Sequence, residues 1–136
     1  MNPTPQSQIN RVIARFYAAF DNRAGQIFDV NGFLEMFLPK ARVTRVLAGE
    51  VESWTIGEFI APRAVMLTDG TLANFHEWEI EGATTIFDNI AEHRSQYRKS
   101  GVMRGDPYNG GGRKIISLCQ VDGSWRIASV LWEDYS

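Results

Sequence analysis

The chain has 136 residues, of which 44% are hydrophobic, and its 16 acidic residues nearly balance its 14 basic ones. This length suits a single domain over residues 1–136. The composition is neither that of a disordered chain nor basic enough to favour a nucleic-acid partner. The N-terminal stretch MNPTPQSQINRV lacks the apolar segment of a signal peptide, and no run approaches the ~18 apolar residues of a membrane span. We therefore expect a soluble, cytoplasmic protein without a nucleic-acid or membrane partner.

The first twenty residues have the pattern of an amphipathic helix. Thr4 supplies a capping hydroxyl, and Pro5 is well placed in a first helical turn. Apolar residues then recur at helical spacing, at Ile9, Val12, Ile13, Phe16, Tyr17 and Phe20. The pattern predicts a first helix that buries one face.

The next fifty residues predict shorter elements. A second amphipathic segment begins at Val30 and should stop at Pro39, and the alternation over residues 41–47 indicates a strand. Thr55 and Glu58 have the spacing of a capping box and open a third helical region, in which Pro62 should break or restart the helix.

From residue 72 onward the sequence alternates as strands do. Two hairpins are predicted, residues 72–87 with 90–99 around Asp88-Asn89, and residues 113–121 with 124–132 around Asp122-Gly123. The glycine-rich stretch 105–112 between them reads as a flexible connection, and it is not a phosphate loop because no Gly-Lys-Ser/Thr follows. Helices followed by an antiparallel sheet predict an α+β fold in which the helices cover one face.

The register of the first hairpin decides which side chains face the interior. A two-residue turn at Asp88-Asn89 sets Glu79 opposite Arg98, Glu81 opposite Gln96 and Ala83 opposite Arg94, which pairs opposite charges on the outer face. A three-residue turn would instead place the glutamates beside Tyr97 and Ser95 and both arginines over Trp78. That register would mix charged and apolar side chains on one face, so it is the less consistent of the two. The chosen register predicts an inner face of His76, Trp78, Ile80, Thr84 and Ile86 beside Ala91, His93, Ser95 and Tyr97.

Four stretches carry a resemblance to a known superfamily: the helix ending in Phe16-Tyr-Ala-Ala-Phe20, then residues 37–43, 89–97 and 121–132. Together they resemble the nuclear transport factor 2-like superfamily, in its bacterial SnoaL-like branch. The resemblance implies a cone-shaped, curved antiparallel sheet wrapped around the first helix, a ligand pocket at the mouth of the cone, and a homodimer packed through the sheets. This fold hosts ketosteroid isomerases, dehydratases, polyketide cyclases, epoxide hydrolases and non-enzymatic binding or assembly domains, so fold alone fixes little about function.

The isomerase activity is not supported at the positions that would carry it. Members resembling ketosteroid isomerase have a tyrosine on the first helix where this sequence aligns Phe16, and an aspartate base where it has about Arg45. An Asp, Arg, Asp set resembling that of the epoxide hydrolases is also not evident on the predicted inner face.

The strongest functional candidates lie on the strand over residues 90–99. His93 could exchange a proton near neutral pH and Tyr97 could orient a substrate, although an inward histidine can equally be a satisfied core residue. We predict a ligand-binding set of Tyr17, Trp78, Ala91, His93, Ser95, Tyr97 and Trp132, with His93 and Tyr97 as the catalytic pair if the protein is an enzyme. We predict no metal, because His76 and His93 lie far apart, and no cofactor.

Three functions remain open after the sequence analysis. The candidates are a carrier of a small organic molecule, an enzyme of the isomerase, dehydratase, cyclase or hydrolase class that uses His93 and Tyr97, and a dimerisation module with a vestigial pocket. Apolar residues on both faces of the last hairpin predict a homodimer, because one face can cover the pocket while the other needs a partner.

Overall fold

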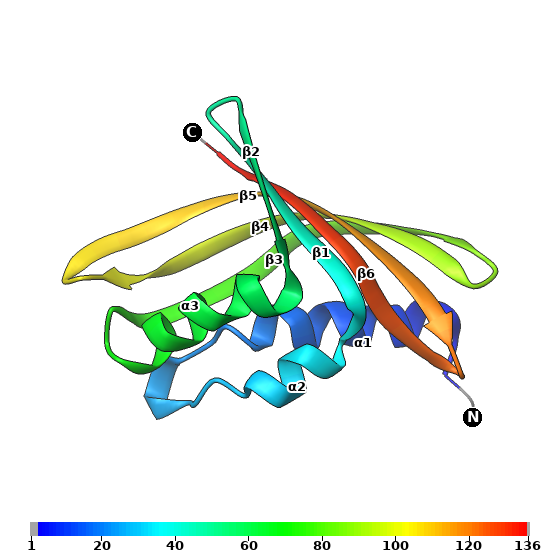
Figure 1. Ribbon diagram of the computed structural model, residues 1–136, viewed down its shortest axis with the longest axis horizontal. Helices are drawn as coiled ribbons and strands as arrows, with labels where there is room; N and C mark the ends of the chain where they lie inside the picture. The colour runs from blue at the N-terminus through cyan, green and yellow to red at the C-terminus, as the bar shows by residue number, and fades with distance from the viewer. Residues whose placement is uncertain (1–2, 136) are drawn as a thin grey trace.

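The computed structural model describes residues 3–135, which form three helices and one short 3-10 turn packed against a single six-stranded sheet (Figure 1). In chain order the elements are α1 (Pro5–Ala18), η1 (Arg23–Gly25), α2 (Val30–Glu35), β1 (Phe37–Leu47), β2 (Glu50–Thr55), α3 (Ile56–Thr68), β3 (Leu72–Phe87), β4 (Ile90–Met103), β5 (Asp106–Val121) and β6 (Ser124–Asp134). The predicted α+β class is confirmed. Within the described residues, no helix is long and apolar enough to cross a membrane.

The starts of the two long helices follow from their capping residues. The Thr4 hydroxyl accepts a hydrogen bond from the backbone N–H of Ser7 at 3.1 Å, which fixes the start of α1. At α3 the Thr55 hydroxyl accepts from the N–H of Glu58 at 3.2 Å, and the Glu58 carboxylate accepts from the N–H of Thr55 at 2.9 Å. The capping box predicted from the sequence is therefore confirmed.

Two predictions about prolines need correction. Pro62 does not break α3, which runs unbroken from Ile56 to Thr68. The proline removes only one backbone hydrogen bond, and the burial of Phe59, Ile60 and Leu67 holds the helix against the sheet. Helix α2 ends at Glu35, before Pro39 is reached, and Pro39 lies within β1.

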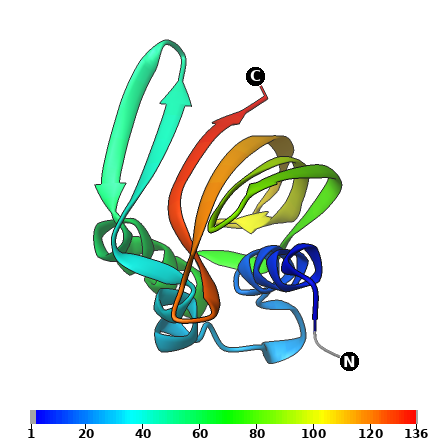
Figure 2. The same ribbon diagram turned by 90° about the vertical axis from the view of Figure 1, so that its right-hand side faces the viewer.

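The sheet has the strand order β2-β1-β6-β5-β4-β3, and Figures 1 and 2 show it curling over the layer of helices. All neighbouring strands are antiparallel except β1 and β6, which pair in parallel, so the prediction of a purely antiparallel sheet is corrected. The long chain segment between β1 and β6 makes the parallel pairing possible. The sequence analysis also missed β2, which forms a hairpin with β1 around Ala48-Gly49, both at positive φ.

The glycine-rich stretch is a strand rather than the flexible connection we predicted. Residues Arg104 and Gly105 form a tight turn, and β5 begins at Asp106. A Cβ atom at Gly111 would lie 2.5 Å from the backbone oxygen of Tyr97, and one at Gly112 would lie 2.3 Å from that of Glu133. Glycine is required here because the curved backbones of β4 and β6 approach β5 too closely for a side chain.

The predicted hairpin register is right near the turn and wrong farther along the strand. Glu81 pairs with Gln96 and Ala83 with Arg94, as predicted, but Glu79 pairs with Tyr97 instead of Arg98. A β-bulge between Glu79 and Glu81 inserts one extra residue into β3, and one extra residue exchanges the two faces of a strand.

The exchange moves different side chains into the interior from those we predicted. The predicted inner row of β3 does not lie beside Tyr97 on the concave face: this concerns His76, Trp78 and Ile80. The side chains of Glu77 and Glu79 face inward instead. On β4 the odd-numbered row does face inward as predicted: Ala91, His93, Ser95 and Tyr97 are all buried.

Candidate functional site

The concave face of the sheet carries polar side chains in three neighbouring rows that run across the strands. In the first row, strand pairing aligns Arg45, Trp132, Lys114 and Ser95. The second row contains Asp134, Gly112, Tyr97 and Glu79. The third row contains Gly110, Lys99 and Glu77. The glycines of β5 leave room above the sheet, since a Cβ atom at Gly112 would lie 2.9 Å from the Tyr97 hydroxyl.

A cavity of about 230 Å³ lies over these rows. Its walls include the aromatic side chains Phe16, Phe20, Phe59, Phe75, Tyr97, Tyr108 and Trp132. Ionisable side chains of both signs also line it: Arg45, Arg63, Lys99, Lys114, Glu77 and Asp134. Four cations against two carboxylates leave a net charge of +2 on the lining when all are ionised.

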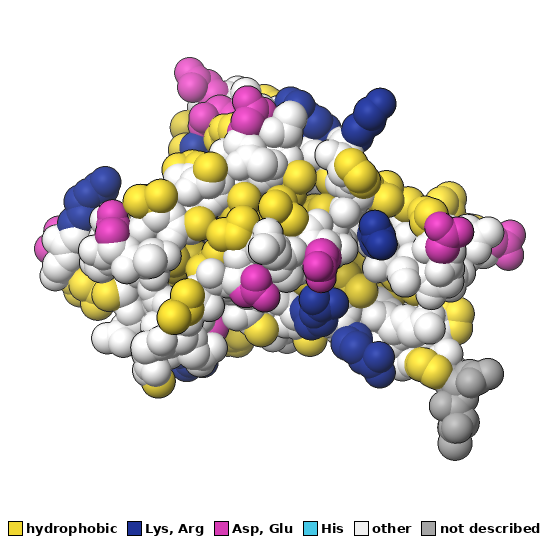
Figure 3. All heavy atoms as spheres, turned by 60° about the horizontal axis from the view of Figure 1, so that its bottom comes forward, with side chains coloured by type: hydrophobic (Ala, Val, Ile, Leu, Met, Phe, Trp, Pro, Cys, Tyr) yellow, Lys and Arg dark blue, Asp and Glu magenta, His cyan; other side chains and the backbone are white. Residues whose placement is uncertain are grey.

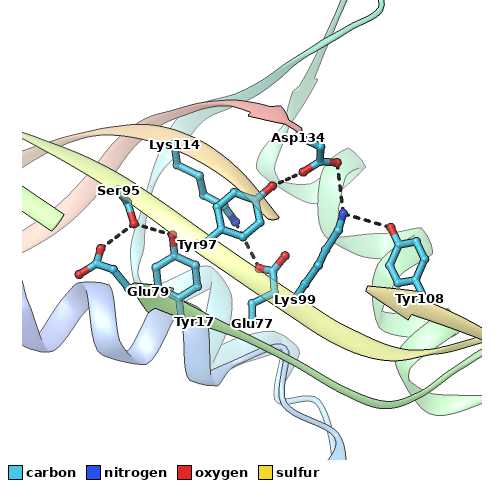
Figure 4. Close-up of polar contacts among 9 residues, drawn as sticks. All are labelled: Tyr17, Glu77, Glu79, Ser95, Tyr97, Lys99, Tyr108, Lys114 and Asp134. Carbon is cyan, nitrogen blue, oxygen red and sulfur yellow. Dashed lines mark hydrogen bonds and ion pairs between the residues drawn. The ribbon is translucent and has the colours of Figure 1, made fainter. Parts of the chain in front are cut away.

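Lys114 is the most deeply buried charged group of the cavity, with its Nζ 3.2 Å from a carboxylate oxygen of Glu77 (Figure 4). The ammonium also lies 4.2 Å from the centre of the Tyr97 ring, a cation–π contact. Burial lowers the pKa of Lys114, while the charge of Glu77 opposes that effect.

A second polar chain crosses the cavity through Tyr97. Its hydroxyl donates to Asp134, and Asp134 accepts from Lys99 Nζ at 3.2 Å, which also lies 3.2 Å from the Tyr108 hydroxyl (Figure 4). Burial raises the pKa of Tyr97, and the hydrogen bond to Asp134 raises it further. Tyr97 is therefore a protonated hydrogen-bond donor rather than a base.

Two arginines stand on the remaining side of the cavity, beside tryptophan rings. Arg45 forms an ion pair with Glu52, and Arg63 donates to the backbone oxygen of Phe59 at 2.9 Å. Burial lowers the pKa of Arg63, and the charge of Arg45 lowers it further.

His93 belongs to a separate hydrogen-bond network, where β3 and β4 face α1. Its Nδ1 lies 2.7 Å from the Thr84 hydroxyl and its Nε2 lies 2.7 Å from Glu79, while Ser95 donates to the same carboxylate at 2.6 Å. The Tyr17 and Ser95 hydroxyls are 2.7 Å apart and form a hydrogen bond, which is drawn in Figure 4. Burial raises the pKa of Glu79, but hydrogen bonds from His93 and Ser95 outweigh it and leave that pKa lowered.

The network around His93 borders a more open hollow of about 440 Å³ between α1 and the edge strand β3. The hollow is lined in part by Tyr17, Trp78, Glu79 and His93, and the cavity is lined by none of these four. Both ring nitrogens of His93 are already hydrogen-bonded within the chain. The structure therefore satisfies this histidine internally.

The predicted ligand-binding residues are divided between these places. Tyr97 and Trp132 line the cavity, whereas Tyr17 and His93 border the hollow. Ser95 is hydrogen-bonded between Tyr17 and Glu79, and Ala91 is buried in the core. The side chain of Trp78 stacks on that of His76, with 4.5 Å between the ring centres, and is 39% exposed. The proposed catalytic pair, His93 and Tyr97, thus does not face one common space.

Sequence reasoning missed most of the charged residues that line the cavity. One available signal was Lys114, which shares a strand face with the apolar residues Ile116 and Leu118 and so had to be buried with a carboxylate partner. Phe16 and Arg45, the two positions at which the isomerase residues are missing, both line the cavity.

Within residues 3–135, no group of three or more His, Cys, Asp and Glu side chains is arranged to hold a metal ion. On the helical side of the molecule in Figure 3, acidic and basic side chains are interspersed rather than gathered into one patch.

Comparison with known proteins identifies the fold. No family model and no curated protein matches this chain. A nuclear transport factor 2-like protein from Salmonella enterica has a TM-score of 0.74 at 17% identity, over 94% of this chain and 89% of its own. A protein with a cystatin-like fold from Nostoc punctiforme has a TM-score of 0.71 at 17% identity, over 99% and 96% of the two chains. A hexachlorocyclohexane dehydrochlorinase has a TM-score of 0.77 at 10% identity, over 96% and 85%.

Proposed function

We propose that this protein, which has the nuclear transport factor 2-like fold, binds a small, partly apolar organic molecule in the cavity of its curved sheet. The observation that carries the proposal is the cavity itself, which combines aromatic walls with a few converging polar groups. Ligand pockets typically have this composition. Membership of the SnoaL-like branch remains a prediction.

The size of the cavity limits the ligand. A volume of about 230 Å³ corresponds to roughly eight water-sized groups at ~30 Å³ each. A single-ring compound or a short branched acid would fit within this volume, whereas a steroid or polyketide would extend beyond it.

The cavity also supports a second candidate function, an enzyme that uses acid–base chemistry. The observation in its favour is Lys114, a buried amine whose pKa is lowered by burial and which lies against the Tyr97 ring. A lysine with a lowered pKa can serve as a base or a nucleophile. The likeness to a dehydrochlorinase supports this candidate only at the level of the fold.

We also propose that the protein is a homodimer, as the sequence analysis predicted. Several large apolar side chains are exposed on the sheet: Trp78, Ile80, Ile115 and Leu131, each between 39% and 47% exposed. Such a surface is typical of an interface. Dimerisation is compatible with ligand binding, and it would be the sole function only if the cavity were vestigial.

A pair of variants tests the binding proposal. Met66 lines the cavity from α3, and its neighbour Val65 is 59% exposed on the same helix. Met66→Trp should fill the cavity, while Val65→Trp adds the same side chain to the surface. Each protein would be denatured for mass spectrometry of any co-purified molecule, and each would be screened against small fragments by ligand-observed NMR.

We expect ligands that bind to the wild type and to Val65→Trp, and no binding of those ligands to Met66→Trp. Thermal unfolding would establish that both variants are folded. Unchanged binding to Met66→Trp would contradict the proposal, as would the absence of any ligand for the wild type.

A further inference from the structure

Two guanidinium groups meet at one end of the cavity on a platform of two stacked tryptophan rings. The ring centres of Trp54 and Trp132 are 5.9 Å apart. Arg45 Cζ lies 5.6 and 6.0 Å from these two centres, and Arg63 Cζ lies 5.5 and 5.8 Å from them. Both arginines line the cavity, so two positive charges are concentrated on one aromatic surface.

The charge of Arg63 has no carboxylate partner among residues 3–135. A guanidinium has five N–H donors, and within this part of the chain Arg63 makes one hydrogen bond, to the backbone oxygen of Phe59. Its side chain also packs over the Phe59 ring, with Cζ 4.0 Å from the ring centre. The side chain is half-buried, so water solvates its charge only in part.

Arg45 is partly satisfied. Its Nη2 donates to Glu52, but its Nε is buried and has no hydrogen-bond acceptor in the described part of the chain. A buried donor without an acceptor is costly.

The other two cations of the cavity are neutralised by carboxylates. Lys114 pairs with Glu77 and Lys99 pairs with Asp134, each at 3.2 Å. Because Glu52 also pairs with Arg45, the unbalanced positive charge of the cavity is that of Arg63, which lies beside Arg45 on the tryptophan rings.

We propose that the cavity is selective for small organic anions, with a carboxylate bound by Arg63 and Arg45 and an apolar body held against the aromatic walls. A planar carboxylate can accept two parallel hydrogen bonds from a guanidinium, which makes this pairing strong and directional. Binding would also relieve the repulsion between two neighbouring guanidiniums. This inference rests on the proposed function and adds the chemical class of the ligand.

Benzoate and benzamide form a matched pair for testing the inference on the wild-type protein, since they have nearly the same shape and differ in charge. Affinities would be measured by isothermal titration calorimetry. Hydrogen bonds to a charged group favour the charged ligand enough that benzoate should bind about 10-fold or more tightly than benzamide. Inorganic phosphate, which has the charge without the apolar body, should not displace benzoate at equal concentration.

Two substitutions then test whether Arg63 binds the carboxylate of benzoate. Arg63→Met keeps an unbranched apolar side chain on α3 in place of the arginine stem but removes the guanidinium, and it should weaken benzoate binding about 10-fold or more while leaving benzamide binding nearly unchanged. Arg94→Met is the control, because Arg94 is 66% exposed on the outer face of β4, and it should leave both affinities unchanged.

The possible failures are distinguishable. Equal binding of benzoate and benzamide to the wild type, or equal loss of both in Arg63→Met, would overturn the anion selectivity and leave the proposed binding function intact. Effective competition by phosphate would overturn the role of the apolar body. If no member of a set of single-ring acids and their amides bound, both the inference and the proposed function would be contradicted.

Discussion

The ion pair between Lys114 and Glu77 should be among the most sensitive contacts of this fold. Their side chains are 7% and 12% exposed, and Nζ lies 3.2 Å from the carboxylate oxygen. With an effective dielectric constant of ~20, two unit charges at 3.2 Å attract each other by about 5 kcal/mol. Removing one partner of a buried pair typically costs ~3–5 kcal/mol, because the other charge remains buried without compensation.

We therefore expect Lys114→Met to lower the free energy of unfolding by ~3–5 kcal/mol, a large part of the ~5–15 kcal/mol that stabilises a typical domain. The double variant Lys114→Met/Glu77→Gln should be more stable than Lys114→Met alone, because no buried charge is left unpaired. Equilibrium urea unfolding followed by tryptophan fluorescence, applied to the wild type, the two single variants Lys114→Met and Glu77→Gln and the double variant, gives the coupling energy of the pair.

An exposed ion pair provides the control. Glu92 and Arg94 lie 3.9 Å apart with side chains 55% and 66% exposed, so Arg94→Met should cost no more than ~1 kcal/mol. The reasoning would be refuted if Lys114→Met were as stable as Arg94→Met, or if the losses of the two single substitutions simply added in the double variant.

Further expected outcomes concern the backbone, the surface and the response to acid. Gly112→Ala should destabilise the protein by ~1–3 kcal/mol in urea unfolding, because the added Cβ would clash with backbone atoms of β6. Gly57→Ala in α3 has open space around the added Cβ and should stabilise the protein by ~0.5–1 kcal/mol. Equal effects of the two substitutions would contradict the close approach of β6 to Gly112. Sedimentation at micromolar concentration should give a dimer for the wild type and a monomer for Ile115→Glu, and a monomeric wild type would contradict the interface. Burial raises the pKa of Glu79, but the hydrogen bonds from His93 and Ser95 outweigh that effect and lower the pKa, so the stabilising contribution of Glu79 is present above the usual glutamate pKa of ~4.3 and is lost as the pH falls through the lowered pKa. Between pH 6 and 3 the urea midpoint should consequently fall more for the wild type than for Glu79→Gln, and parallel profiles would count against this role.

Local signals in the sequence predicted much of the fold. The hydroxyl of Thr4 and the capping box of Thr55 and Glu58 marked helix starts that the structure reproduces, because a cap is a contact between residues three positions apart. The turn at Asp88-Asn89 set the register of the nearby residues of β3 and β4 for the same reason. The resemblance to the nuclear transport factor 2-like superfamily rested on four sequence stretches, and the solved structures support the fold that it implied.

The missed features depend on contacts between distant parts of the chain. The parallel pairing of β1 with β6 joins segments separated by more than half the sequence. The glycines of β5 were read as a flexible connection because the two backbones that crowd Gly112 belong to other strands. The arginine site has the same origin, since Arg45, Trp54, Arg63 and Trp132 come from four different elements.

The chemistry of the cavity depends on one extra residue in β3. With the regular register that the sequence suggested, Trp78 and Ile80 would face inward and the acidic row would face solvent. The bulge at Ile80 reverses these faces, so that Glu77 lies beneath Lys114 and Glu79 lies beside His93. Because Glu77 neutralises Lys114, the positive charge that remains without a carboxylate partner in the cavity is that of Arg63. A local irregularity in a single strand thus determines where the cavity can accept an anion, and a strand pattern with a strict period of two cannot reveal it.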